Sequence, residues 1–92
     1  MAFRRGGAGK QRDVNEASII AALRAYGVRV WQVSGAGLPD LLCYYNRRWT
    51  PMEIKSARGR LTEVQAAAWM DHPFEIVRDE AQALRAVGVV LR

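Results

Sequence analysis

The sequence predicts an α/β fold whose elements follow the order αβββαβα, with a closing strand as an option at the end. Two observations indicate this class. Short stretches of apolar or alternating apolar and polar residues, typical of strands, recur along the chain. Between them, apolar residues at helical spacing follow residues that commonly cap helices.

The first helix is predicted to begin near Asp13, because Asp13 and Glu16 have the spacing of a capping box. Apolar residues recur at helical intervals until Gly27, which ends the helix. Residues 28–33 alternate between apolar and polar types and predict a half-buried strand. Residues 34–39 include two glycines and a proline, which predict a turn.

Two further strands are predicted to form a hairpin. Residues 40–45 make the first of them, 46–48 a tight turn, and 49–56 the second. Pro51 has no N–H to donate to a neighbouring strand. We therefore expect the first half of its strand to lie at an edge or a bulge.

A second helix is predicted from Thr62 to about Met70, because Thr62 and Gln65 form another capping box. Residues 74–77 predict a short strand. Asp79 then opens a third capped helix, and residues 89–91 are the candidate closing strand. In the third helix, two apolar residues are expected to point inward, namely Leu84 and Val87.

The composition predicts one soluble domain over residues 13–92. Half of the residues are hydrophobic and a quarter are charged. No apolar run approaches the roughly 18 residues of a membrane span, and no hydrophobic stretch follows the basic start as in a secretory signal. The lone Cys43 and lone His72 supply neither an internal disulfide nor a zinc ligand set. We expect an intracellular protein in a reducing, cytoplasmic setting.

The formal net charge of +5 favours a polyanionic partner, above all nucleic acid. Residues 1–12 hold three of the eight glycines and four basic residues, and they predict a flexible basic arm. Two interpretations remain open for this arm: a disordered tail without a role, or an extension whose Arg4, Arg5 and Lys10 contact phosphates.

The candidate chemistry lies on the predicted hairpin. Alternation places Glu53 and Lys55 on one side of their strand. Antiparallel pairing through the turn brings Asp40 opposite the end of that strand, close enough to Glu53 to share an ion. A magnesium ion, which prefers oxygen ligands, could be held by these two carboxylates and the Ile54 carbonyl, as phosphodiester hydrolysis requires. Lys55 can orient the nucleophile or stabilise negative charge on the phosphate.

Two accessory residues have two interpretations each. Glu16 lies on or beside the apolar stripe of its helix, where an unpaired carboxylate costs several kcal/mol. It either serves a metal site, directly or through water, or caps its own helix. Gln65 completes a capping box, and the site would also need a polar residue there to hold Lys55 or water.

These residues resemble a known group of enzymes. Asp40 after a glycine-rich turn, followed by Glu53-Ile-Lys55, is similar to the PD-(D/E)xK nuclease superfamily. The longer stretches 31–42 (WQVSGAGLPDLL) and 53–65 (EIKSARGRLTEVQ) resemble its virus-type replication-repair nuclease branch, VRR-NUC. The resemblance covers about residues 14–87.

The resemblance implies a restriction-endonuclease-like central mixed sheet flanked by helices, and DNA cleavage that depends on Mg²⁺ or Mn²⁺. It implies metal ligation by Asp40, Glu53 and the Ile54 carbonyl. Lys55 would be the catalytic lysine, with Glu16 and Gln65 as accessory site residues. Stand-alone, phage-encoded relatives imply a homodimer that acts on branched DNA such as four-way junctions, with replication or repair proteins as further partners. Two alternatives remain: a DNA-binding module without catalysis, and a nuclease subunit that needs a partner.

Other residues are interpreted as follows. Trp31, Trp49 and Trp69 are expected in the core or at a dimer contact, with base stacking as the alternative. Cys43 is expected to be buried and His72 to lie in a loop. Arg58 and Arg60 are candidates for phosphate contacts, with an ordinary solvated turn as the alternative.

Overall fold

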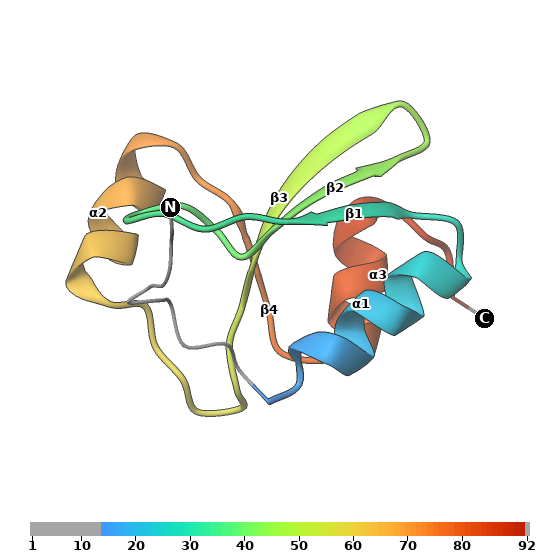
Figure 1. The fold of residues 1–92 in the computed structure, drawn as a ribbon, viewed down its shortest axis with the longest axis horizontal. Coiled ribbons are helices and arrows are strands. Elements are labelled where there is room, and N and C mark those ends of the chain that lie inside the picture. The colour runs from blue at the N-terminus through green and yellow to red at the C-terminus, as the bar shows by residue number, and fades with distance from the viewer. Residues whose placement is uncertain (1–13, 92) are drawn as a thin grey trace, which may run out of the picture.

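The chain folds around a mixed four-stranded sheet with three helices, in a computed structural model that describes residues 14–91 (Figure 1). The elements are α1 (Glu16–Ala25), β1 (Arg29–Gln32), β2 (Leu41–Tyr45), β3 (Arg48–Ile54), α2 (Glu63–Asp71), β4 (Glu75–Val77) and α3 (Glu80–Val87). The strand order is β1-β2-β3-β4; β1, β2 and β3 pair antiparallel, and β4 is parallel to β3. The α/β class and the order αβββαβα are confirmed, whereas residues 89–91 do not form the optional closing strand.

The hydrophobic core lies between one face of the sheet and the helices α1 and α3, which lie side by side (Figure 1). Burying each large aliphatic side chain there stabilises the fold by roughly 1.5–3 kcal/mol. The most deeply buried members come from both layers: Ile19, Leu23, Leu41, Met52, Ile54 and Val77. The predicted inward-facing residues of α3, Leu84 and Val87, are buried as well.

The start of α1 differs from the prediction. Its N-cap is Asn15, and Glu16 is the first helical residue, so the capping box predicted from Asp13 is wrong. The Asn15 side chain does not cap the helix; it donates to the Arg78 carbonyl at 2.9 Å. This long-range bond fixes where the helix begins. Gly27, with a φ of 85°, ends the helix as predicted.

The β2–β3 hairpin turns more tightly than predicted. Asn46 and Arg47 have φ values of 52° and 68°, as a two-residue hairpin turn requires, and Arg48 already belongs to β3. Pro51 pairs with β2, but β4 pairs with β3 only from Met52 onward. The first half of β3 is therefore an edge, as Pro51 predicted.

The helix α2 stands apart from the other two helices (Figure 1). Its predicted capping box is confirmed: the Gln65 N–H donates to the Thr62 hydroxyl at 3.1 Å, and the Gln65 side chain accepts from the Thr62 N–H. No residue of α2 is buried. In the described chain α1 and α3 cover the core face of the sheet, and α2 reaches the sheet through the bond from Gln65 to Glu53.

Several single-residue predictions can be compared with the structure. The tryptophans are 37–56% exposed, so a place in the core is wrong for Trp31, Trp49 and Trp69. Cys43 is fully buried as expected, and His72 is exposed at the end of α2. None of the described helices has the length and apolarity needed to cross a membrane.

Candidate functional site

Two acidic side chains meet where the β2–β3 hairpin opens. Leu41 pairs with Met52, and one further step of this register sets Asp40 across from Glu53. The Asp40 carboxylate accepts a hydrogen bond of 2.8 Å from the Ile54 backbone N–H. The two carboxylates are only 4% and 1% exposed. The register and this hydrogen bond place Asp40 beside the end of β3, the strand that carries Glu53.

Glu53 is held by two groups that favour its charged form. The Gln65 side-chain amide donates to its Oε2 atom at 2.9 Å, and the Lys55 ammonium lies 3.4 Å from the same oxygen. The Lys55 side chain is 13% exposed, so the pair sits at the border between interior and solvent. A buried carboxylate is tolerated only when such partners compensate its lost hydration. The backbone N–H of Lys55 donates to the Val77 carbonyl, which continues the sheet beneath the pair.

Gln65 caps its helix as predicted and also contacts the candidate site. Its oxygen accepts from the Thr62 N–H at 3.0 Å, and its nitrogen donates to Glu53. The helix cap therefore fixes the side chain that orients the carboxylate. The sequence suggested Lys55 or water as its partner, and the structure adds Glu53, to which the side-chain nitrogen donates.

The loop before Asp40 brings α2 to the site. The Val33 N–H donates to the Asp40 carbonyl at 2.9 Å, which closes the loop of residues 34–39. Gly37 has a φ of 79°, and a Cβ added there would stand 3.4 Å from the Ala68 side chain. The glycine thus provides both the left-handed turn and the close approach to α2.

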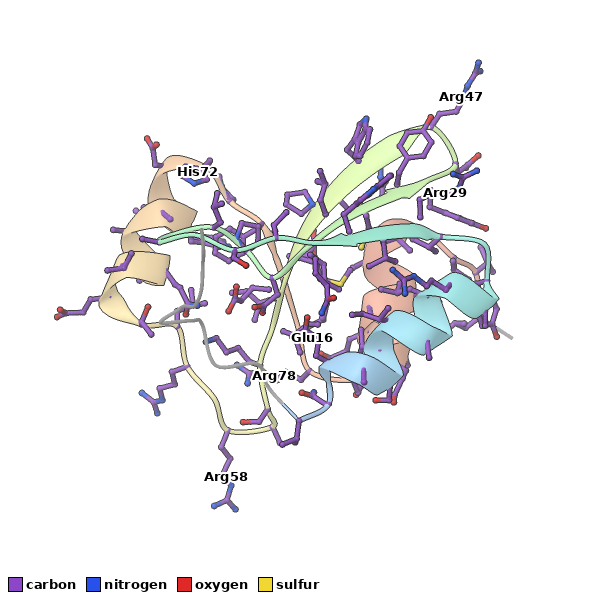
Figure 2. The ribbon with its side chains drawn as sticks, in the orientation of Figure 1. Glu16, Arg29, Arg47, Arg58, His72 and Arg78 are labelled. Carbon is purple, nitrogen blue, oxygen red and sulfur yellow. The ribbon has the colours of Figure 1, made fainter. Side chains whose placement is uncertain are left out.

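Glu16 is buried, at 3% exposure, and accepts a hydrogen bond of 3.0 Å from the Gln32 side chain. Figure 2 shows it between the start of α1 and the sheet. Gln32 pairs with Leu41, the residue that follows Asp40, so Glu16 contacts the core face of the sheet next to the start of β2. The capping-box interpretation of Glu16 is wrong, because it is the first residue of the helix rather than the third.

Three polar residues that support this region were missed by the sequence analysis. They are Asn15, Gln32 and Arg78. Gln32 had a signal in the sequence, because it is a polar residue at the end of an alternating strand that was predicted to lead into the turn before Asp40. The two others carry no local signal, since their partners lie 63 and 19 residues away in the chain.

The basic candidates lie on a loop beside the site. Arg58 and Arg60 are exposed, and Figure 2 shows Arg58 extending away from the body of the protein. Arg78 donates to the carbonyls of Ser56 and Gly59 and so fixes the base of this loop. The remaining candidates, Arg4, Arg5 and Lys10, lie outside the described residues, as does the whole predicted arm of residues 1–12.

The donor set fits a small, hard divalent cation. Carboxylate and carbonyl oxygens suit Mg²⁺ and Mn²⁺, and Mg²⁺ keeps several waters, so one or two protein carboxylates suffice. Asp40, Glu53 and the Ile54 carbonyl are the groups that could hold it. Within residues 14–91 there is no cluster of three or more His, Cys, Asp and Glu side chains that could bind a metal.

Comparison of the chain with protein-family models, with curated proteins and with solved structures found no match. The function must therefore be inferred from the residues of the site themselves.

Proposed function

We propose that this protein is a metal-dependent deoxyribonuclease that hydrolyses phosphodiester bonds. The observation that carries the proposal is the buried pair Asp40 and Glu53 at the mouth of a hairpin, with Lys55 3.4 Å from the Glu53 carboxylate. Burying two acids beside a lysine has a desolvation cost, and replacing such buried charges by apolar residues often leaves the free energy of folding unchanged or more favourable. A catalytic role accounts for this arrangement.

Each side chain has a separate task in this proposal. Asp40, Glu53 and the Ile54 carbonyl would hold Mg²⁺ or Mn²⁺, which supplies phosphate charge neutralisation and a more acidic water when bound. Lys55 orients the attacking water or stabilises the charge that builds on the phosphate. Gln65 fixes Glu53, and Glu16 with Gln32 supports the strand beside Asp40.

The fold type, the oligomeric state, the DNA substrate and the cellular location are proposed together with the activity. The order αβββαβα and the position of the acids support a restriction-endonuclease-like arrangement of the VRR-NUC type. A homodimer would present two sites related by a two-fold axis, which suits a symmetric branched substrate such as a four-way junction. A cytoplasmic, phage-encoded enzyme working beside replication or repair proteins is consistent with the reducing setting expected for Cys43.

The activity is tested by incubating end-labelled duplex, single-stranded, flap and four-way-junction DNA with the full chain. Each reaction contains Mg²⁺, Mn²⁺ or a chelator, and wild type is compared with Lys55→Ala. We expect metal-dependent cleavage that the substitution slows by at least about 100-fold, as for the loss of a charge-stabilising group. A folded wild type that binds DNA but cuts none of these substrates would instead favour a binding module, or a subunit that needs a partner.

A further inference from the structure

Three aromatic rings stand together on the sheet face that α1 and α3 do not cover. Trp31, Tyr44 and Trp49 come from β1, β2 and β3, and we call this cluster the aromatic platform. The ring centroids of Trp31 and Trp49 are 5.6 Å apart, and those of Tyr44 and Trp49 are 4.8 Å apart. Even so, the two indoles remain 47% and 56% exposed. A large exposed aromatic surface that is already ordered is typical of a binding site.

The platform and the candidate site belong to the same face of the sheet. Trp31 pairs with Leu42, and Leu42 pairs with Pro51. Side chains return to a face at every second residue, so the next pair on this face is Asp40 and Glu53. At about 3.3 Å per residue, the two rows are roughly 7 Å apart. A DNA strand that follows β2 and β3 would therefore pass over the rings and reach the end of the hairpin where the two buried acids lie.

The charge around the platform is positive. Arg29 pairs with Tyr44 and shares its face, and Arg47 lies in the turn of the hairpin. Figure 2 shows both arginines at the hairpin end of the molecule. The sequence has no Asp or Glu between Glu16 and Asp40, and none between Asp40 and Glu53. Aromatic rings beside exposed cations, on strands whose one acid, Glu53, is buried, match a ligand that offers flat bases and phosphates.

We propose that the aromatic platform stacks unpaired bases of the DNA strand whose phosphate lies at Asp40 and Glu53. The inference rests on the proposed function and names its substrate class: DNA with single-stranded bases beside the cleavage point. Every base has a π-face, so stacking of this kind requires no particular sequence.

Two other uses of the exposed aromatics fit less well. A second copy docked symmetrically on this face would bring the arginines of both copies together. The one acid of β1–β3, Glu53, is buried and already paired with Lys55, so it is not available to pair with them. A groove of about 500 Å³ between Trp49, Trp69 and Phe74 is lined by one charge of each sign, Arg48 and Glu75, so it offers no net positive charge to a phosphate backbone.

The test measures DNA binding in chelator, so that cleavage plays no part in the readout. Labelled oligo-dT and a duplex of equal length are titrated with the full-length wild type and two double variants. Trp31→Leu with Trp49→Leu keeps apolar side chains but removes the rings, whereas Trp31→Phe with Trp49→Phe keeps rings. Met70→Ala, which removes an apolar side chain 78% exposed on α2, is the control. Circular dichroism confirms that each variant is folded, and sedimentation gives its oligomeric state.

We expect the Leu variant to bind oligo-dT at least about tenfold more weakly, as the loss of one stacked base predicts. The Phe variant and the control should stay within about threefold of wild type, and duplex affinity should change little, since paired bases offer no free faces. Unchanged oligo-dT binding by a folded Leu variant would overturn the inference. An equal loss of affinity for duplex and for oligo-dT would also overturn it. The same holds if the wild type has no affinity for oligo-dT, or if the Leu variant binds more weakly because it has changed from dimer to monomer. If the protein binds oligo-dT through the rings but shows no metal-dependent cleavage, the proposed nuclease activity is overturned and the stacking inference stands.

Discussion

The side-chain amide of Gln65 donates a hydrogen bond of 2.9 Å to the carboxylate of Glu53. Because the oxygen of the same amide accepts from the Thr62 N–H, one residue joins the first turn of α2 to the candidate site. None of the residues of α2 is buried, so its position depends on a few contacts of this kind. The stability of a surface helix and the geometry of a buried acid are thereby coupled.

Two substitutions at opposite ends of the capping box can separate the role of Gln65 as a helix cap from its role as a partner of Glu53. Thr62→Ala removes the hydroxyl that accepts from the Gln65 N–H, and should lower the free energy of unfolding by about 1 kcal/mol. Gln65→Ala removes the cap and the bond to Glu53, so it should also slow cleavage by about 10–100-fold, as for other groups that orient a metal ligand. Urea unfolding and cleavage rates per folded molecule measure the two effects. Equal cleavage rates for the two variants would show that Gln65 is only a cap.

Asp40 should be required for cleavage but not for folding or DNA binding. Asn at this position keeps an oxygen that can accept from the Ile54 N–H, so the hairpin stays intact while the negative charge is lost. Asp40→Asn should reduce the cleavage rate by at least about 100-fold, because even outer-shell partners of a metal cost 10–100-fold. Asp71→Asn, at an exposed acid on α2, makes the same charge change and should have no effect. Metal-dependent cleavage that survives in Asp40→Asn contradicts the proposed site.

Arg58 and Arg60 should contact DNA phosphates rather than bases. Both side chains are exposed on a loop whose base is fixed by the Arg78 hydrogen bonds to Ser56 and Gly59. Replacing Arg58 and Arg60 by Ala should weaken binding equally for different sequences. The slope of log affinity against log salt should decrease by about one unit for each phosphate that the variant no longer binds.

The control for this experiment is Arg85→Ala, which removes an exposed cation from α3, on the other side of the sheet. It should leave the salt slope unchanged. If the double substitution at Arg58 and Arg60 leaves the slope as it is in wild type, the two residues belong to an ordinary solvated turn.

Burial raises the pKa of the Cys43 thiol from 9.0 to about 11. Between pH 9 and 11 the unfolded chain therefore releases the thiol proton while the folded chain retains it. Stability from this group is complete below pH 9 and is lost as the pH rises toward 11, with a slope of at most about 1.4 kcal/mol per pH unit. Chemical denaturation across this range should show a steeper decline for wild type than for Cys43→Ala. Parallel declines would mean that the thiol titrates alike in both states.

The sequence by itself determined the elements that depend on neighbours in the chain. The capping residues Thr62 and Asp79 set the starts of α2 and α3, and Gly27 set the end of α1. The approach of Asp40 to the end of β3 was also predicted, because antiparallel pairing places the start of one hairpin strand opposite the end of the other.

Only the tertiary structure decided how distant parts of the chain meet. Asn is a residue type that commonly caps helices, yet the Asn15 side chain donates to the carbonyl of Arg78, 63 residues away. Glu16 finds Gln32 only because α1 packs against the sheet. Trp31 and Trp49 have the hydrophobicity of core residues but lie on the sheet face that α1 and α3 do not cover, and they are 47% and 56% exposed. Burial depends on which element covers a residue, and that depends on the packing of the whole chain rather than on any local pattern.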